Sequence, residues 1–349
     1  MDWDTRRPPG TSVASTHQGP LSPVLSMRLP CARALAIVLS LLSATLAASY
    51  RQHKEIIGED FMEDFNVEGI PDPTHGRVTY VNKATAQRSN LTYATKTRFI
   101  LRADSESVVK RGERGRQSVR VRSKDSYRRH VAVFDIRHMP EGCGTWPAVW
   151  EVGDNWPHGG EIDILEGVNN IGPNAATLHT GANCAMDANR SGQKGEQAKN
   201  NDCDVSAGRS NLGCSVRMRD ARSYGTPFNK AGGGYYAVER ASNHIKVWFW
   251  TRSAANVPAS VKSGAKTVDP DTWGTPDAYF PGGQNCDIDK KFGPQHIIIN
   301  LTFCGDWAGN ANAYGAAGCP RTCIDFVDNN PQEFKNAYFD IASLRTYIP

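Results

Sequence analysis

The sequence predicts an all-β protein built as a sandwich of two antiparallel sheets. Its 349 residues are 39% hydrophobic, which is enough apolar material for a full core. Short runs rich in β-branched and aromatic residues alternate with clusters of Gly, Pro and Asn, which is typical of strands and turns. No segment carries the 3.6-residue periodicity of a long amphipathic helix. The expected strands are 97–102, 118–123, 131–137, 235–240, 245–252 and 295–303.

The first 48 residues are expected to lie outside the folded domain. Arg28 and Arg33 precede the apolar run 34–48, which ends in small residues and predicts a secretory signal. The run is shorter than the roughly 20 apolar residues that span a bilayer, so an uncleaved membrane anchor is the less favoured alternative. Residues 1–26 are polar and Pro-rich, and Met27 is a possible true start. Residues 49–349 are expected to form a single domain.

Cysteine usage predicts the oxidising environment of a secreted protein. Of the nine cysteines Cys31 lies in the signal segment, which leaves an even number for disulfides, whose pairing the sequence does not reveal. Cys319 and Cys323 have a spacing near that of a zinc pair, but no second close pair accompanies them, and we expect no metal. Three glycosylation sequons agree with the secretory route, the third of them inside an expected strand. They begin at Asn90, Asn189 and Asn300.

The charge balance gives no support to a nucleic-acid partner. The formal net charge is +4, and the basic residues are scattered except in 110–122 and 127–130. We expect these two clusters to be solvated faces.

One segment, 159–169, carries three carboxylates in an otherwise apolar run. In a regular strand Glu161 and Asp163 would share one face while Glu166 pointed the other way. A β-bulge at Ile164-Leu165 would bring Glu166 onto the face of the other two, and bulges are frequent beside active sites. Two carboxylates about 5–5.5 Å apart are what a retaining glycosidase needs. An acidic string of this kind also occurs by chance on exposed strands, so its surroundings decide its meaning.

The chemistry of such a pair assigns the roles. The nucleophile must be ionised to attack the anomeric carbon, and its partner must hold a proton for the departing oxygen. We assign Glu161 as nucleophile and Glu166 as acid/base. Asp163, a close third carboxylate, is expected to tune their titration.

Tryptophans precede this segment. Three of the eight, Trp146, Trp150 and Trp156, lie within about one strand and its turn. Aromatic faces pack against the C–H groups of a sugar ring, although burial in the core is the alternative for each one.

These residues, taken together, resemble fungal family 16 glycoside hydrolases of the laminarinase type, the endo-1,3(4)-β-glucanases. The resemblance covers nearly all of the chain after the signal. It rests on the segment 161–166, the run 144–150, Leu178-His179-Thr180, the run 302–310, the segments 72–80 and 115–120, and 138–144.

The resemblance implies a β-jelly-roll with a concave glucan-binding cleft and a retaining mechanism. It implies the same roles for the three acids, and it implies that further residues line the cleft. These are Trp150, Trp156, His179, Trp307 and, with a weaker match, Arg116. The expected protein is a secreted monomer that hydrolyses internal β-1,3 bonds, and β-1,4 bonds next to them, without a cofactor. Two alternatives remain open, a glucan transglycosylase of the same fold and a non-catalytic β-glucan recognition protein.

Overall fold

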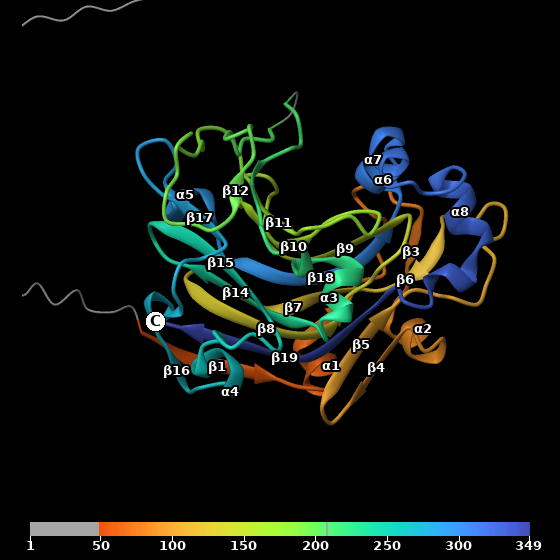
Figure 1. Cartoon of the computed structure of the whole chain (residues 1–349). Coiled ribbons are helices and arrows are strands. Elements are labelled where there is room, and N and C mark those ends of the chain that lie inside the picture. Colours follow the sequence, from red (N-terminus) through yellow and green to blue (C-terminus); the bar gives the residue numbers. More distant parts are fainter. Residues whose placement is uncertain (1–48, 207–208) are drawn as a thin grey trace, which may run out of the picture. The chain divides into compact units, whose positions relative to one another are not determined.

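The computed structural model describes residues 49–206 and 209–349, which belong to one compact unit. The predictions made for residues 1–48 lie outside this part of the chain. Two large antiparallel sheets dominate it (Figure 1), as the sequence predicted. No helix in the described ranges has the length and apolar character needed to cross a bilayer.

The first sheet has nine strands. Seven form the path β16-β1-β19-β8-β14-β15-β17, while β5 pairs with β19 and β4 pairs with β5. Its strands are β1 (Tyr50–Ile56), β4 (Thr92–Thr95), β5 (Arg98–Arg102), β8 (His130–His138), β14 (Gly234–Arg240), β15 (His244–Thr251), β16 (Thr267–Val268), β17 (Ala278–Pro281) and β19 (Tyr338–Ile348). The last strand of the chain, β19, therefore lies inside this sheet, between β1 and β8.

The second sheet has eight strands in the order β12-β13-β11-β10-β9-β18-β7-β2. Its strands are β2 (Phe65–Val67), β7 (Arg120–Tyr127), β9 (Thr145–Gly153), β10 (Glu161–Glu166), β11 (Ala175–His179), β12 (Glu196–Gln197), β13 (Cys214–Arg217) and β18 (Gln295–Phe303). A separate parallel pair is formed by β3 (Val78–Tyr80) and β6 (Arg116–Ser118).

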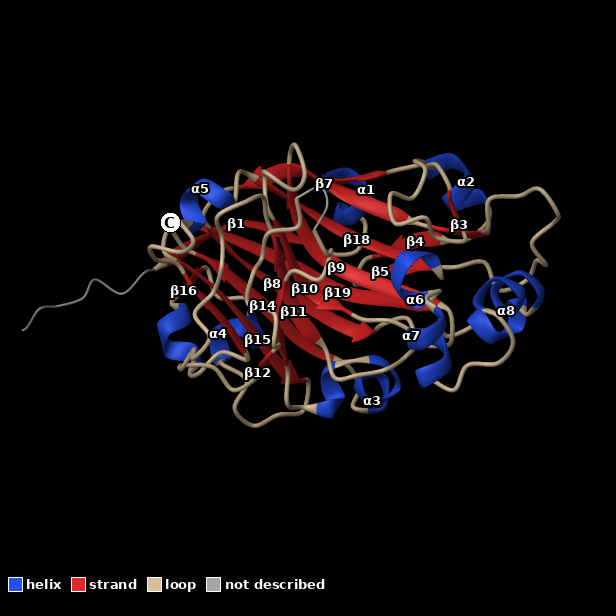
Figure 2. Cartoon of the chain, turned by 90° about the horizontal axis from the view of Figure 1, so that it is seen from above, coloured by secondary structure: helices blue, strands red, loops and turns tan. Residues whose placement is uncertain are grey.

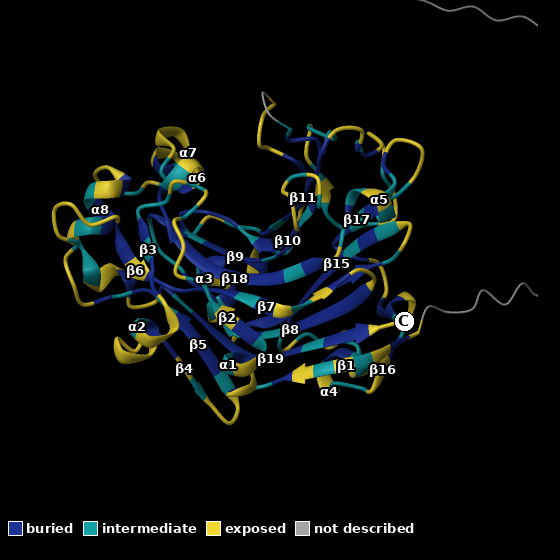
Figure 3. Cartoon of the chain, turned by 180° about the vertical axis from the view of Figure 1, so that it is seen from behind, coloured by how far each residue is buried: buried dark blue, intermediate teal, exposed yellow. Residues whose placement is uncertain are grey.

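The main hydrophobic core lies between the two large sheets. On β18, Ile297, Ile299 and Leu301 are fully buried in this core, while Asn300 and Thr302 alternate with them and point to the opposite face. Figure 3 shows the strands as mostly buried, with exposed residues concentrated in turns and short helices. We call the face of the eight-stranded sheet that is turned away from the core the outer face.

Helices are short and lie at the margins of the sheets (Figure 2). They span four to seven residues among the described parts, in agreement with the absence of a long amphipathic pattern. They are α1 (Asp60–Asp64), α2 (Lys83–Arg88), α3 (Gly225–Lys230), α4 (Ala259–Ser263), α5 (Ile288–Lys291), α6 (Gly305–Ala308), α7 (Ala311–Ala316) and α8 (Cys323–Asn329).

Four disulfides pair all eight cysteines of the described ranges, as the even count predicted. Two of them hold the helical segment α6–α8 to the eight-stranded sheet, Cys143–Cys319 next to β9 and Cys304–Cys323 at the end of β18. The other two, Cys184–Cys286 and Cys203–Cys214, tie down the long segment between β11 and β13. The zinc alternative is excluded for these residues because every thiol is oxidised.

Candidate active site

The bulge predicted in β10 is present. Asp163 pairs with Trp150 of β9 and Leu165 pairs with Val149, so Ile164 is the extra residue. Ile164 and Leu165 are consecutive, yet both are fully buried in the core between the sheets. The residue that follows them is thereby turned to the outer face.

Glu161, Asp163 and Glu166 lie together on this outer face. Glu161 is the register partner of His179 on the neighbouring strand β11. The His179 ring atom Nε2 lies 3.2 Å from Asp163 Oδ2 and 3.8 Å from Glu161 Oε1. His179 is therefore placed among the acids, where the sequence predicted a hydrogen-bonding residue.

Burial perturbs the titration of all three acids. Desolvation raises the pKa of Glu161 to about 8, with a further rise from the charge of Asp163 and an opposing effect of His179. Desolvation alone raises the pKa of Asp163 to about 8. The pKa of Glu166 also rises to about 8, through desolvation and Asp163, and the Trp146 hydrogen bond opposes that rise. Such a cluster holds protons at neutral pH, as a site with one acid and one ionised carboxylate must.

Trp146 connects Glu166 to the aromatic surface at one end of the site. Its indole Nε1 donates a hydrogen bond of 2.9 Å to Glu166 Oε1. Its ring meets that of Trp307 edge to face, with the ring centroids 5.6 Å apart. Trp307 is 39% exposed and lies on α6, which two disulfides brace. An accessible indole therefore packs on the ring that binds the carboxyl group of Glu166.

At the other end of the acid strand, Trp156 is 46% exposed and lies close enough to Glu161 to oppose the rise in the pKa of that carboxyl. Trp150 lies between β10 and β18 and donates from Nε1 to Asn300 Oδ1 at 2.7 Å. The Arg120 guanidinium lies 5.1 Å from the centroid of the Trp150 ring. All four tryptophans that adjoin the acids are thus fixed by a polar contact or by a neighbouring ring.

The side chain of Asn300 is used in hydrogen bonds to Trp150 and Tyr80. It is buried, and its Nδ2 donates to the Tyr80 hydroxyl at 2.9 Å while its Oδ1 accepts from Trp150. Its sequon is therefore inaccessible in the folded protein, whereas Asn90 and Asn189 are exposed.

Arg116 does not line the site, and this prediction is corrected. It lies on β6 with 1% of its surface exposed. Its guanidinium donates to the backbone carbonyls of Asp104, Ser107 and Val327 and lies 4.7 Å from the Phe334 ring centroid. A guanidinium whose donors are used inside the protein has a structural role.

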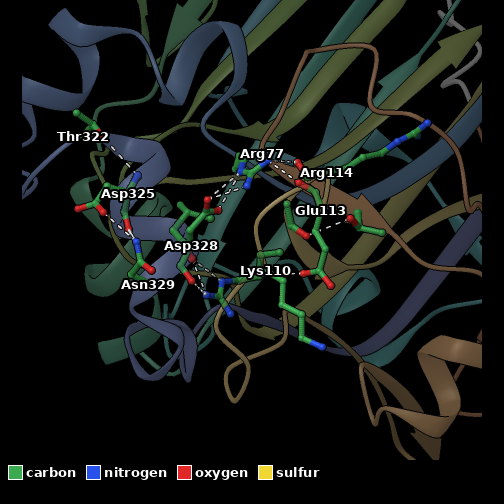
Figure 4. Close-up of polar contacts among 12 residues, drawn as sticks. Arg77, Lys110, Glu113, Arg114, Thr322, Asp325, Asp328 and Asn329 are labelled. Carbon is green, nitrogen blue, oxygen red and sulfur yellow. Dashed lines mark hydrogen bonds and ion pairs between the residues drawn. The ribbon is translucent and has the colours of Figure 1, made fainter.

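The basic cluster 110–122 is also only partly a solvated face. Lys110, Arg111 and Arg114 are exposed, but Arg116 and Arg120 are buried. Arg77 holds the exposed loop, donating to the carbonyls of Glu113 and Arg114 and pairing with Asp328 (Figure 4).

A pocket of about 460 Å³ adjoins this loop and does not contain the three acids. It is lined by His75, Gly76, Arg77, Arg114, Cys304, Gly305, Asp306, Gly309, Thr322, Cys323 and Ile324. The clustered acids and exposed indoles, and not this pocket, define the candidate active site.

Glu161, Asp163 and His179 each offer one ligand atom within 4.8 Å of the others, which is a spacing that a divalent cation accepts. Two acids with a histidine partner explain these short distances without a metal ion. A site without a cofactor therefore stays the prediction.

The sequence pointed to Trp146 as one of three possible sugar platforms, but its hydrogen bond to Glu166 was not predicted. Another residue of the site was not singled out at all. Asn174, whose amide contacts β10, follows Gly172-Pro173 in a turn and carries no pattern that would reveal it.

A family model described as the XgeA-like catalytic GH16 domain matches residues 65–347. The chain belongs to this GH16 family. The GH16 chain is 43% identical over 302 residues to a probable glycosidase of Schizosaccharomyces pombe, a match that covers 86% of this chain and 70% of that protein. It spans about half the length of a probable endo-1,3(4)-beta-glucanase of Aspergillus clavatus, with 40% identity over 338 residues and 94% of this chain covered.

Solved structures agree with this assignment. Laminarinase 16A of Phanerochaete chrysosporium, with β-glucans in donor and acceptor sites, is 55% identical with a TM-score of 0.84, covering 86% of this chain and all of that one. An elongating GH family 16 β-1,3-glucosyltransferase is 40% identical with a TM-score of 0.78, covering 85% of this chain and 99% of that one. The jelly-roll predicted from the sequence is confirmed, and the GH16 chain is a glycoside hydrolase by family.

Proposed function

We propose that this protein is a retaining endo-β-glucanase. It would hydrolyse internal β-1,3 bonds, and β-1,4 bonds next to β-1,3 bonds, in laminarin or mixed-linkage glucans. The observation that carries the proposal is the bulged strand β10, which turns Glu161, Asp163 and Glu166 to one face beside exposed indoles.

In the first step ionised Glu161 attacks the anomeric carbon while Glu166 gives its proton to the departing glycosidic oxygen. A C–O bond to Glu161 forms as the glycosidic C–O bond breaks. In the second step Glu166, now ionised, takes a proton from a water molecule that attacks the same carbon and releases Glu161. The raised pKa of Glu166 suits the acid role at neutral pH. Burial and the charge of Asp163 raise the pKa of Glu161 as well, and His179 opposes that rise and so favours the ionised form that attacks.

The surroundings fit a neutral polysaccharide. Trp156, near Glu161, and Trp307, which packs on Trp146 beside Glu166, are partly exposed and would serve as stacking platforms for glucosyl units. The small net charge suits an uncharged glucan better than nucleic acid, and the four disulfides support secretion. The proposed enzyme acts as a monomer without a cofactor. In this proposal residues 49–349 form the catalytic domain and residues 1–48 an N-terminal extension with the signal.

A second candidate function is transglycosylation, in which another glucan replaces water in the second step. The 40% identity to an elongating β-1,3-glucosyltransferase favours keeping it. The non-catalytic alternative is less well supported, because a binding protein would not need the acid cluster.

The test is an assay of purified protein on laminarin, lichenan and cellulose, with reducing ends and product lengths measured together. We expect reducing ends from laminarin and lichenan, products shorter than the substrate, and first-formed products in the β-configuration by proton NMR. Products longer than the substrate with no gain of reducing ends would replace hydrolysis by transglycosylation. The variant Glu161→Ala should lose at least about 1,000-fold in kcat, and near-normal activity would refute its role as nucleophile.

A further inference from the structure

The bulge in β10 interrupts the backbone pairing with β11. Regular register between the two strands ends at Asp163, which faces Thr177. Beyond that point Ile164 O and Glu166 N lack a strand partner on this side. Leaving buried backbone groups unpaired is costly, so a bulge next to the acid/base needs a substitute partner.

The side chain of Asn174 supplies that partner. Asn174 precedes β11, and its Oδ1 accepts from Glu166 N at 2.8 Å while its Nδ2 donates to Ile164 O at 2.8 Å. One side-chain amide thus binds both backbone groups, as a peptide unit of a neighbouring strand would.

Asn174 is itself fixed by burial and by hydrogen bonds of its backbone. It has no exposed surface, its N–H donates to Ser223 Oγ at 3.0 Å, and its carbonyl accepts from Met218 N at 2.8 Å. Ser223 in turn accepts from the Tyr236 hydroxyl through its carbonyl. Because the core fixes Asn174, its contacts with the bulge also fix the backbone of β10.

Glu166 is consequently fixed at two points, its backbone by Asn174 and its carboxylate by Trp146. The next residue, Gly167, packs so closely on Tyr224 that a Cβ atom would lie 2.7 Å from Cζ of the ring. Glu161, in contrast, has regular register partners in both neighbouring strands, Val152 and His179. The contact of Asn174 with the bulge therefore acts on Glu166 and not on Glu161.

We propose that Asn174 is a positioning residue that holds the bulge of β10 and thereby places Glu166 for proton transfer. This inference rests on the proposed function, in which Glu166 is the acid/base. It assigns to Asn174 no contact with substrate, and it predicts a loss confined to the steps that need a positioned proton.

The experiment compares two substrates that differ in their need for acid catalysis. Laminarin has a poor alcohol leaving group, whereas 2,4-dinitrophenyl β-laminaribioside has a leaving group that departs without protonation. General acid catalysis contributes about 100-fold to 10,000-fold. We expect Asn174→Ala in the full chain to lose at least about 30-fold in kcat/KM on laminarin and less than about 3-fold on the aryl glycoside.

Azide gives an independent readout of the second step. It attacks the anomeric carbon of the glycosyl-enzyme without base assistance, forms a C–N bond and releases Glu161. Asn174→Ala should therefore turn over the aryl glycoside faster with azide and yield β-laminaribiosyl azide. The wild type should not respond.

Two further variants separate placement from folding. Asn229 is a matched control, since its Oδ1 accepts from Met139 N and its Nδ2 donates to Met139 O, away from β10. Asn229→Ala should lower Tm and leave the ratio of the two substrates unchanged. Asn174→Asp can form both contacts with the bulge when protonated, so at pH 5 it should be more active on laminarin than Asn174→Ala.

Glu166→Ala is the benchmark that separates the two proposals. If it shows substrate selectivity and azide rescue while Asn174→Ala loses both substrates equally, the positioning role is overturned and the acid/base assignment stands. If Glu166→Ala itself retains laminarin activity, the proposed function fails first. If Asn174→Ala does not fold, Asn174→Asp decides. The inference is overturned if Asn174→Asp matches the wild type on both substrates and its activity does not increase at low pH.

Discussion

The hydrogen bond from Trp146 to Glu166 should set the alkaline limit of activity. Its indole Nε1 lies 2.9 Å from Glu166 Oε1 and stabilises the ionised carboxylate, so it lowers the pKa of Glu166 against the rise from burial. In Trp146→Phe the aromatic ring remains but this donor is gone. The pKa of Glu166 should then rise, and the protonated acid should persist to higher pH.

The size of the shift follows from the strength of the lost bond. A hydrogen bond to a charged group contributes about 1.5–3 kcal/mol. One pKa unit corresponds to about 1.36 kcal/mol, so the lower bound predicts a shift of about 1 unit. The alkaline limb of kcat/KM against pH, measured on laminarin, should move upward by about that amount.

Trp150→Phe is the matched control, because Trp150 donates to the amide oxygen of Asn300 and not to a carboxylate. Its activity can fall, but its alkaline limb should stay in place. Equal alkaline limbs for wild type and Trp146→Phe would refute the reasoning, as would a downward shift.

Further predictions concern the acids, the platform and the disulfides. Asp163→Asn removes a charge that raises the pKa of Glu166, so the alkaline limb should move to lower pH. The folded pKa of Asp163 lies above its unfolded value, so as pH rises past about 4 the unfolded chain loses this proton while the fold must retain it, and stability falls. Asp163→Asn should therefore raise Tm at pH 7 but not at pH 3. Trp307→Ala should raise KM for laminarin about 5-fold, equivalent to about 1 kcal/mol of stacking, with a smaller change in kcat; an unchanged KM would exclude the platform. Replacing the Cys184–Cys286 pair by Ala should lower Tm more than replacing Cys203–Cys214, because its loop spans 102 residues against 11, and the reverse order in calorimetry would contradict the loop argument.

The acid strand shows how far a sequence can specify an active site. The spacing of Glu161, Asp163 and Glu166 is inconsistent with strict alternation, and that conflict alone located the bulge at Ile164-Leu165. His179 was placed correctly beside the acids through the resemblance of its surroundings. The alternation of side chains along a strand is a local pattern. It therefore shows which face of the sheet a side chain occupies once the strand itself is known.

Contacts that depend on distant backbone could not be predicted in this way. Arg116 looked like a cleft residue, but its environment is formed by Asp104, Ser107 and Val327, which no local pattern associates with it. Asn174 gave no signal because its role depends on backbone groups that only the bulge leaves free.

Strand β19 was missed for a related reason. Register shifts between Asp340 and Ile341 and between Ile341 and Ser343 break the alternation of buried and exposed residues, and the strand is buried on both faces for most of its length. A segment with this mixture of Asp, Ser and apolar residues does not resemble a half-exposed strand. Its place in the sheet became visible only from its partners.

The position of β19 also constrains when the protein can fold. This strand, Tyr338–Ile348, is made after all the others, yet it joins β1, β5 and β8 within one sheet. During synthesis the edges of these earlier strands stay unpaired until β19 has been made. Their pairing with β19 then joins residues that are far apart in the sequence. Vectorial folding from the N-terminus therefore cannot complete the nine-stranded sheet, and a ribosome-bound chain that ends before Tyr338 should remain dependent on chaperones and open to proteolysis.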